Sequence, residues 1–234
     1  NDYEHYFLEG FATYPGFVYT VPGDFSSAAF PLAAALITQS QITLHNLDRN
    51  DVQGDKEFIS VLEKMGGEFL FDENNKTLTV QPNAQLHGVT VDINRFIDAV
   101  TILAVVACFA SGETRITGAA IARQKESNRL ESIACELNKM GGHVEVTEDG
   151  LIIKPAKLTG THVYSYHDHR VAMSLAVAGL GADSETCVQD VACMDKTYKH
   201  FASSFSELGA TIVRTNIVKT DVVKKRSSNE RPIS

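Results

Sequence analysis

The chain has 234 residues, of which 44% are hydrophobic and 21% are charged, and its formal net charge is -8. This composition is typical of a soluble globular protein with an ample core. The acidic balance argues against a general nucleic-acid-binding protein, which needs a dominant basic surface, and no apolar run reaches the about 18 residues of a membrane span.

The first residues form no signal peptide and include no initiator methionine, so we expect the chain to be processed or part of a longer one. Residues 1–21 contain two strand-like stretches, at 6–8 and 17–21, ahead of the first complete structural unit. The four cysteines lack the spacing of a metal site. Cys108 and Cys135 lie within apolar helical patterns, which predicts that these two are buried thiols in a reducing cytoplasm.

An alanine-rich, apolar helix is predicted three times, and a short strand follows each copy. Helices that are apolar nearly all round belong inside a domain. The helices are predicted at 26–37, 98–110 and 170–180, and the strands that follow them at 41–44, 113–116 and 186–188. Another strand is predicted before each helix, at 17–21, 88–93 and 161–164.

Each copy also contains a second, amphipathic helix. These helices end at Gly66, Gly141 and Gly209. These glycines are 75 and 68 residues apart, longer than the roughly 20–50 residues of common solenoid repeats. A strand follows each glycine, and the first two copies add one more, at 76–80 and 151–154. We therefore predict an α/β (α+β) fold with three βαβαββ units, residues 22–87, 88–158 and 159–214. They would pack with pseudo-threefold symmetry around the buried helices.

The last residues, 215–234, are rich in lysine, arginine and serine. This composition predicts a disordered or loosely attached tail. A basic tail that contacts an acidic partner is the alternative.

Residues 123–131 place cations where a helix begins. Asn128 is predicted as the N-cap, with Glu131 as its reciprocal carboxylate. Arg129 then lies in the first turn, where the helix dipole disfavours a cation by about 0.3–1 kcal/mol. Either this is an ordinary solvated charge cluster, or an anionic ligand binds beside the free N–H groups.

Four cations recur at predicted helix N-termini that should share one end of the domain: Lys125, Arg129, Arg170 and Lys196. Asp98, Glu126 and His169 lie among them. Such a group favours a ligand with several anionic groups, and carboxylates within it could act as general acids or bases. Asp98 could also be no more than a helix N-cap. No P-loop, GxGxxG, HExxH or nucleophile elbow is present, so hydrolase, nucleotide and zinc functions have no support.

The K-E-S-N-R core at 125–129 resembles a signature of the 5-enolpyruvylshikimate-3-phosphate synthases (3-phosphoshikimate 1-carboxyvinyltransferases). Four more stretches resemble the same family in the same order: 23–28, 97–99, 168–170 and 196–197. The resemblance implies transfer of the enolpyruvyl group of phosphoenolpyruvate to the 5-hydroxyl of shikimate 3-phosphate, through a tetrahedral ketal. It also implies a fold of two domains, each with three repeated units, and no metal or organic cofactor.

The resemblance implies a role for each site residue. Asp98 would bind the shikimate hydroxyls and take the 5-hydroxyl proton, and Glu126 would serve the methylene carbon as acid and base. Lys196 would be a second candidate for proton transfer. The phosphoenolpyruvate clamp would be Arg129, Arg170 and Lys196, with His169 beside it and Lys125 on the shikimate-phosphate side.

The motifs of the family's earlier half do not occur in this sequence. We therefore expect the later half of the enzyme, with residues 1–21 as the last strands of the other domain, and the missing first half as its partner. The chain alone would then hold half a site. The alternatives are a UDP-N-acetylglucosamine enolpyruvyl transferase, which shares fold and chemistry, and a noncatalytic interaction module.

Overall fold

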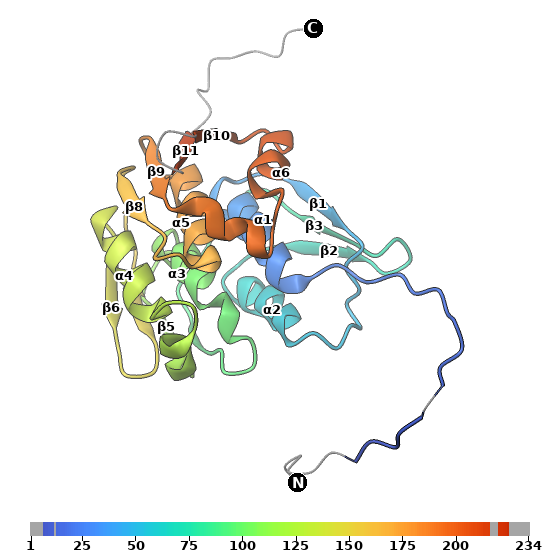
Figure 1. Cartoon of the computed structure of the whole chain (residues 1–234). Helices are drawn as coiled ribbons and strands as arrows, with labels where there is room; N and C mark the ends of the chain where they lie inside the picture. Colours follow the sequence, from blue (N-terminus) through green and yellow to red (C-terminus); the bar gives the residue numbers. More distant parts are fainter. Residues whose placement is uncertain (1–6, 12, 216–219, 225–234) are drawn as a thin grey trace, which may run out of the picture.

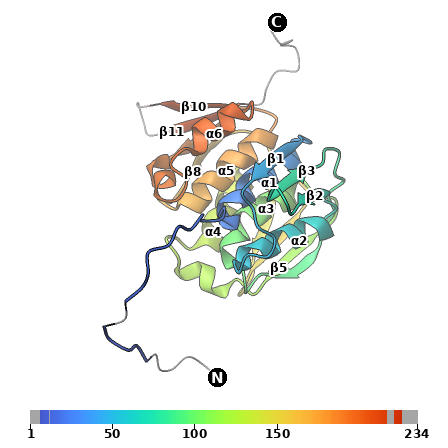
Figure 2. The same cartoon turned by 90° about the vertical axis from the view of Figure 1, so that its right-hand side faces the viewer.

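Three β-sheets lie around a centre of three helices in this protein (Figure 1). The computed structural model describes residues 7–11, 13–215 and 220–224. In Figure 2 the sheet that contains β10 and β11 lies at the top, the sheet of β1 to β3 lies at the right, and α1, α3 and α5 run between the sheets.

Each sheet takes its strands from one continuous stretch of chain. The first sheet has the order β1-β3-β2, with β1 (Ile42–His45), β2 (Phe69–Asp72) and β3 (Thr77–Val80). The second has the order β4-β5-β7-β6, with β4 (Thr90–Asp92), β5 (Thr114–Thr117), β6 (His143–Val146) and β7 (Leu151–Lys154). The third has the order β8-β9-β11-β10, with β8 (His162–Tyr164), β9 (Thr186–Gln189), β10 (Thr211–Thr215) and β11 (Thr220–Lys224).

The second and third sheets share one pattern of strand pairing. Their first two strands are parallel, whereas the other neighbours are antiparallel. In the first sheet both pairings are antiparallel, and no strand lies on the outer side of β1 among the described residues. The first sheet therefore lacks the parallel strand that opens the other two.

The three apolar helices form the core. They are α1 (Phe25–Ile37), α3 (Val100–Cys108) and α5 (His169–Gly181), and they pack against one another. All nine residues of α3 are buried, which confirms that an evenly apolar helix lies inside the domain. The amphipathic helices are α2 (Glu57–Lys64), α4 (Arg129–Lys139) and α6 (Phe201–Glu207). Short 3-10 turns occur at Gly54–Lys56, Ile97–Ala99, Ala120–Gln124 and Val191–Lys196.

The three amphipathic helices end in the same way. Gly66, Gly141 and Gly209 all have positive φ angles, of 98°, 86° and 93°. In each case the residue after the glycine donates its N–H to a carbonyl five residues earlier: Gly67 to Leu62, Gly142 to Leu137, and Ala210 to Phe205. This is the Schellman cap, in which glycine adopts the left-handed conformation without the penalty of a Cβ atom. The repeated glycines are thus explained by the backbone.

Two predictions about the chain ends are wrong. Residues 17–21 form no strand and are exposed, because the chain before Gly23 turns away from the edge of β1 with which it would pair. In addition, the predicted tail is not irregular throughout, because residues 220–224 form β11, between β9 and β10. The β-branched Thr220, Val222 and Val223 favour a strand. The prediction of a disordered tail rested on the content of basic residues and did not take these three into account. The stretch 6–8 and the other basic tail residues lie wholly or partly outside the described residues.

The α/β class is confirmed, and most predicted helices and strands occur within a few residues of their expected bounds. The unit boundaries and a threefold symmetry of the packing stay predictions. None of the helices in the described part of the chain has the length and apolar run needed to span a bilayer.

Candidate functional site

A buried arginine lies where the first turns of α4 and α5 meet. The side chain of Arg129 is enclosed, since the residue is 1% exposed. Its Nε donates to Oδ2 of Asp168 at 2.8 Å, its Nη1 to Oδ1 of Asp98 at 2.6 Å, and its Nη2 to Oε2 of Glu126 at 2.7 Å. Three carboxylates from three segments therefore bind one guanidinium group. Neither sequence interpretation, a solvated cluster or a bound anionic ligand, anticipated protein carboxylates as the partners.

Local structure places these groups. Asp168 is the N-cap of α5 and accepts the N–H of Arg170, while Asn128 caps α4 by accepting the N–H of Glu131. The carboxylate of Glu131 does not complete the predicted reciprocal cap but accepts from Arg123 at 3.2 Å. Both helices thus begin beside each other, with Arg129 directly after the cap of α4 and Arg170 two residues after the cap of α5.

Asp98 is the point where three cations meet. Besides Arg129, it lies 3.3 Å from Nη2 of Arg170 and 3.4 Å from Nζ of Lys125. Its side chain makes no cap bond to the helix that follows, which excludes the N-cap interpretation. Burial opposes ionisation, but the charges of Arg170, Arg129 and Lys125 outweigh it and hold the pKa of Asp98 below its ordinary value.

Glu126 joins this group to Lys196, which lies 70 residues further along the chain. The Nζ of Lys196 donates to Oε1 of Glu126 at 2.8 Å, and the lysine side chain is otherwise mostly exposed. The hydrogen bond from Lys196 is the main reason that the pKa of Glu126 falls to about 2, with Arg129 adding to it. Glu126 is therefore an anion at neutral pH.

His169 lies beside these groups without a hydrogen bond on one nitrogen. The residue is 3% exposed, and its Nδ1 is 3.8 Å from Oε1 of Glu126 and 3.9 Å from Oδ1 of Asp168. Burial lowers the pKa of His169, although the two carboxylates oppose this. The imidazole is therefore neutral at pH 7, with Nδ1 open to a further partner.

The charges in the site nearly cancel. Lys125, Arg129, Arg170 and Lys196 face the three carboxylates described above, which leaves one net positive charge when His169 is neutral. Asp55 lies within electrostatic range, and burial raises its pKa against the influence of Arg170. Any anionic ligand would have to compete with these carboxylates for the cations.

Glu126, Asp168 and His169 place one possible metal-ligand atom each within 4.8 Å of one another. However, Arg129 donates to both carboxylates, and Ser127 also donates to Asp168, at 3.1 Å from Oδ2. A divalent cation here would have to lie against a guanidinium group and break these bonds. The residues fit an ion-pair cluster better than a metal centre, and the absence of a cofactor stays a prediction.

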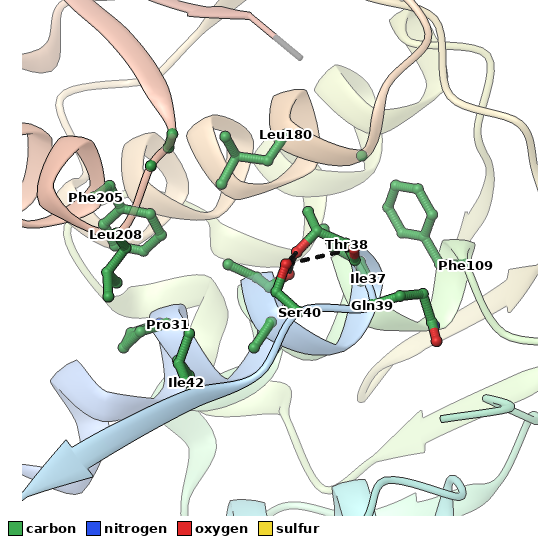
Figure 3. A pocket seen from close by; sticks show the side chains of 15 residues that line it. Pro31, Ile37, Thr38, Gln39, Ser40, Ile42, Phe109, Leu180, Phe205 and Leu208 are labelled. Carbon is green, nitrogen blue, oxygen red and sulfur yellow. Dashed lines mark hydrogen bonds between the residues drawn. The ribbon is translucent and has the colours of Figure 1, made fainter. Parts of the chain in front are cut away.

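A large cavity lies at the other end of the central helices (Figure 3). It has a volume of about 510 Å³ and is mainly apolar, with Phe109, Leu180, Phe205 and Leu208 in its lining. Ile37 and Thr38, at the C-terminal end of α1, also line it, whereas Ser26, at the other end of α1, accepts from Arg170 at 3.1 Å. The cavity is therefore remote from the charged cluster.

Residues 1–205 match the family model described as EPSP synthase (3-phosphoshikimate 1-carboxyvinyltransferase). This chain belongs to the EPSP synthase family. It is 41% identical over 212 residues to the 3-phosphoshikimate 1-carboxyvinyltransferase of Ruminiclostridium cellulolyticum, covering 91% of this chain and 50% of that protein. It is 43% identical over 209 residues to the enzyme of the same name from Chlamydia muridarum, covering 88% of this chain and 47% of that protein.

A solved EPSP synthase from Acinetobacter baumannii has a similar fold, with a TM-score of 0.72 and 29% identity, over 80% of this chain and 46% of that one. The chain thus spans about half the length of the curated relatives that it matches. Membership of the EPSP synthase family confirms the resemblance seen in the sequence, and the half-length match fits the expected later half.

The structure connects all seven residues that the sequence singled out: Asp98, Lys125, Glu126, Arg129, His169, Arg170 and Lys196. Their catalytic and binding roles stay predictions. Sequence reasoning missed Asp168 as the main partner of Arg129, although it stands in the matching stretch 168–170. It also missed Ser26, which stands in the matching stretch 23–28, and Asp55, for which the sequence carries no signal beyond polarity.

Proposed function

We propose that this chain forms the later half of an EPSP synthase. The proposed reaction transfers the enolpyruvyl group of phosphoenolpyruvate to the 5-hydroxyl of shikimate 3-phosphate and releases phosphate, in aromatic amino-acid (chorismate) biosynthesis. The observation that carries the proposal is the convergence on Asp98 and Glu126 of all four cations that the family resemblance marks. A cytoplasmic location stays a prediction.

The geometry supports different residues for the different proton transfers. In the proposed first step, the 5-hydroxyl oxygen bonds to C2 of phosphoenolpyruvate, Asp98 takes the hydroxyl proton, and the methylene C3 gains a proton. Loss of phosphate and of one C3 proton from the tetrahedral ketal then restores the double bond. Lys196 is the better first donor to C3, since Glu126 is ionised and accepts from Lys196 at 2.8 Å. Glu126 is then placed to take the proton back.

Substrate anions would replace carboxylates around the cations. Asp98 is held as a weak base by three cations in this structure. Phosphate and carboxylate groups that bind Arg170 and Lys125 would draw these cations away and raise the basicity of Asp98. Arg129 is the least available of the proposed clamp residues, because its donors are already bound by three carboxylates.

We propose that the missing first half of the fold binds at the open edge of β1. In the other two sheets, the residue after the parallel strand donates to the neighbouring strand, from Ile93 to Thr117 and from Ser165 to Gln189. Gly23 makes the equivalent bond to Asn46 at 2.6 Å, yet the residues before Gly23 leave the sheet (Figure 1). An open edge is a ready site for one more strand.

Two further features support this partner. Residues 7–11 and 13–21 are exposed and include five aromatic side chains that are at least 68% exposed in the isolated chain: Phe7, Phe11, Tyr14, Phe17 and Tyr19. The apolar cavity of Figure 3 reaches Ile42 of β1. Large exposed apolar surfaces mark sites of association. Residues 1–21 would then complete the other domain, as proposed from the sequence.

The test is to mix this chain with a recombinant first half of a relative and to measure phosphate release and heat of binding. Turnover of phosphoenolpyruvate with shikimate 3-phosphate only in the mixture supports the proposal. Ordinary turnover by the chain alone contradicts the half-site argument. Turnover with UDP-N-acetylglucosamine instead identifies the related transferase, and association without turnover of either substrate identifies a noncatalytic module.

A further inference from the structure

A strained turn lies directly before the charged residues of α5. Tyr166 and His167 have φ angles of 55° and 57°, and Asp168 donates its N–H to the carbonyl of Ser165 at 3.0 Å. Two consecutive residues with positive φ are the pattern of a type I′ turn, which favours asparagine and glycine. A tyrosine and a histidine adopt it only where their surroundings hold them there.

A buried carboxylate of α4 holds this turn. Glu136 is 0% exposed. It accepts the hydroxyl of Tyr166 on Oε1 at 2.7 Å and the backbone N–H of Tyr164 on Oε2 at 3.0 Å. Lys139 neutralises it from the solvent side, with Nζ 2.8 and 2.9 Å from the two oxygens. Burial and Glu136 raise the pKa of Tyr166, so its hydroxyl remains the donor.

The turn has a second set of contacts on its own side. The hydroxyl of Tyr164 and Nε2 of His167 are 3.0 Å apart, and Ser165 Oγ accepts the N–H of His167 at 3.1 Å. Ser165 Oγ in turn donates to the carbonyl of Asp190 at 3.0 Å. These contacts join residues within the third sheet and its loops, whereas Glu136 connects the turn to α4.

α4 contacts the segment before α5 at two points. Arg129, in its first turn, binds Asp168, and Glu136 binds the turn just before Asp168. The two residues are seven positions apart, close to two helical turns, so both side chains leave the same face of α4. A shift of the turn would therefore move Asp168, His169 and Arg170 relative to Arg129.

We propose that Glu136, acting with Tyr166, is a positioning residue that holds the strained turn so that Asp168, His169 and Arg170 meet the other charged residues of the site. Its importance for turnover rests on the proposed function. The positioning itself can be measured in the chain alone, by a readout that needs no substrate.

The first measurement follows the titration of His169 by NMR in the full chain, in wild type, Glu136→Gln and Tyr166→Phe. The groups that face His169 are Asp168 and Arg170 of α5, Glu126 before α4, and Arg129. Burial keeps the pKa of His169 below its ordinary value, so a displaced turn should raise its titration midpoint towards about 6.5. Tyr166→Phe should give the smaller shift, because it removes one hydrogen bond and no charge.

Val80→Ala in β3 serves as the control, because it removes buried apolar volume in the first sheet, away from the turn. It should lower the melting temperature without moving the midpoint of His169. If both variants at the turn melt earlier, but His169 titrates as in wild type, Glu136 is a structural residue only and the proposal is wrong.

The second measurement uses the mixture with a first half. If the wild-type mixture turns over, Glu136→Gln should lower kcat/KM about 10- to 100-fold, since small misplacements of reacting groups have effects of this size. Val80→Ala should stay near wild type. Unchanged kcat/KM in Glu136→Gln overturns the catalytic importance of the positioning. If the wild-type mixture shows no turnover, the result contradicts the proposed function. The NMR titration of His169 then still tests whether Glu136 positions the turn.

Discussion

Arg129 and Asp168 form a buried ion pair that joins the first turn of α4 to the N-cap of α5. The Nε–Oδ2 distance is 2.8 Å, and the side chains are 2% and 0% exposed. The pair explains how a cation can stand in the first turn of a helix, where the dipole opposes it. Burial opposes the charge of Arg129, but Asp168, Asp98 and Glu126 outweigh this and raise its pKa, so the arginine remains charged.

Asp168→Ala should lower the free energy of unfolding by about 3–5 kcal/mol, because it leaves a buried guanidinium group without its main partner. Urea denaturation of the full chain measures this. The control is Glu113→Gln, which breaks an exposed pair with Arg115 at 3.1 Å and should cost no more than about 1 kcal/mol. A loss below 1 kcal/mol in Asp168→Ala would show that the ion pair is not needed for stability.

Gly66→Ala should destabilise the protein more than Gly141→Ala. Both residues have positive φ, so each alanine costs about 1–2 kcal/mol in backbone strain. A Cβ at position 141 meets nothing closer than 3.7 Å, whereas one at position 66 would lie 2.5 Å from the carbonyl oxygen of Gln85. Denaturation midpoints of the two variants give the order, and equal effects would contradict the clash.

Stability should fall as the pH drops below about 7, in part because of His169. Its folded pKa lies below the unfolded value of 6.5, so the unfolded chain binds the proton more readily. The stability that the neutral imidazole contributes is complete above 6.5 and is lost as the pH falls towards the folded pKa. His169→Gln should flatten this part of the profile. The exposed His143→Gln should leave it unchanged, and identical profiles for all three proteins would refute the assignment.

If the proposed function is right and the mixture with a first half turns over, Asp98→Asn should lower its kcat by about 10²- to 10⁴-fold, the size expected for loss of a general base. The amide cannot take the 5-hydroxyl proton, although it can still bond to Arg129 and Arg170. Phosphate release under saturating substrates measures the effect. Glu145→Gln, on the exposed side of β6, is the matched control and should keep wild-type activity. Full activity in Asp98→Asn would assign the base elsewhere.

A chain that ends after Thr215 should be less stable than one that ends after Lys224. The longer chain keeps β11, which pairs with β10 over five residues and with β9 over three. Each backbone hydrogen bond contributes about 1 kcal/mol, so the loss should be at least about 3 kcal/mol, or roughly 6–12 °C in Tm. Calorimetry compares the two chains, and equal Tm values would mean that β11 adds no stability.

Local patterns in the sequence already determined the helices, the glycine caps and the identity of the charged residues. The end of α4 at Gly141 depends on residues no more than five positions apart, as does the N-cap at Asn128. Such contacts form within one segment, so periodicity and residue type are sufficient to predict them. The family motifs, which are also local, predicted in addition which residues belong to the site.

Only the tertiary structure decided which charges meet. Arg129 and Asp168 are 39 residues apart, and their contact depends on how α4 packs against α5. The same holds for the strands at the chain ends. β11 forms because it pairs with β9 on one side and β10 on the other. Residues 17–21 have a more strand-like sequence, but they leave the sheet and expose the edge of β1. Strand formation and buried ion pairing both need a partner from a distant part of the chain, and a local pattern contains no information about that partner.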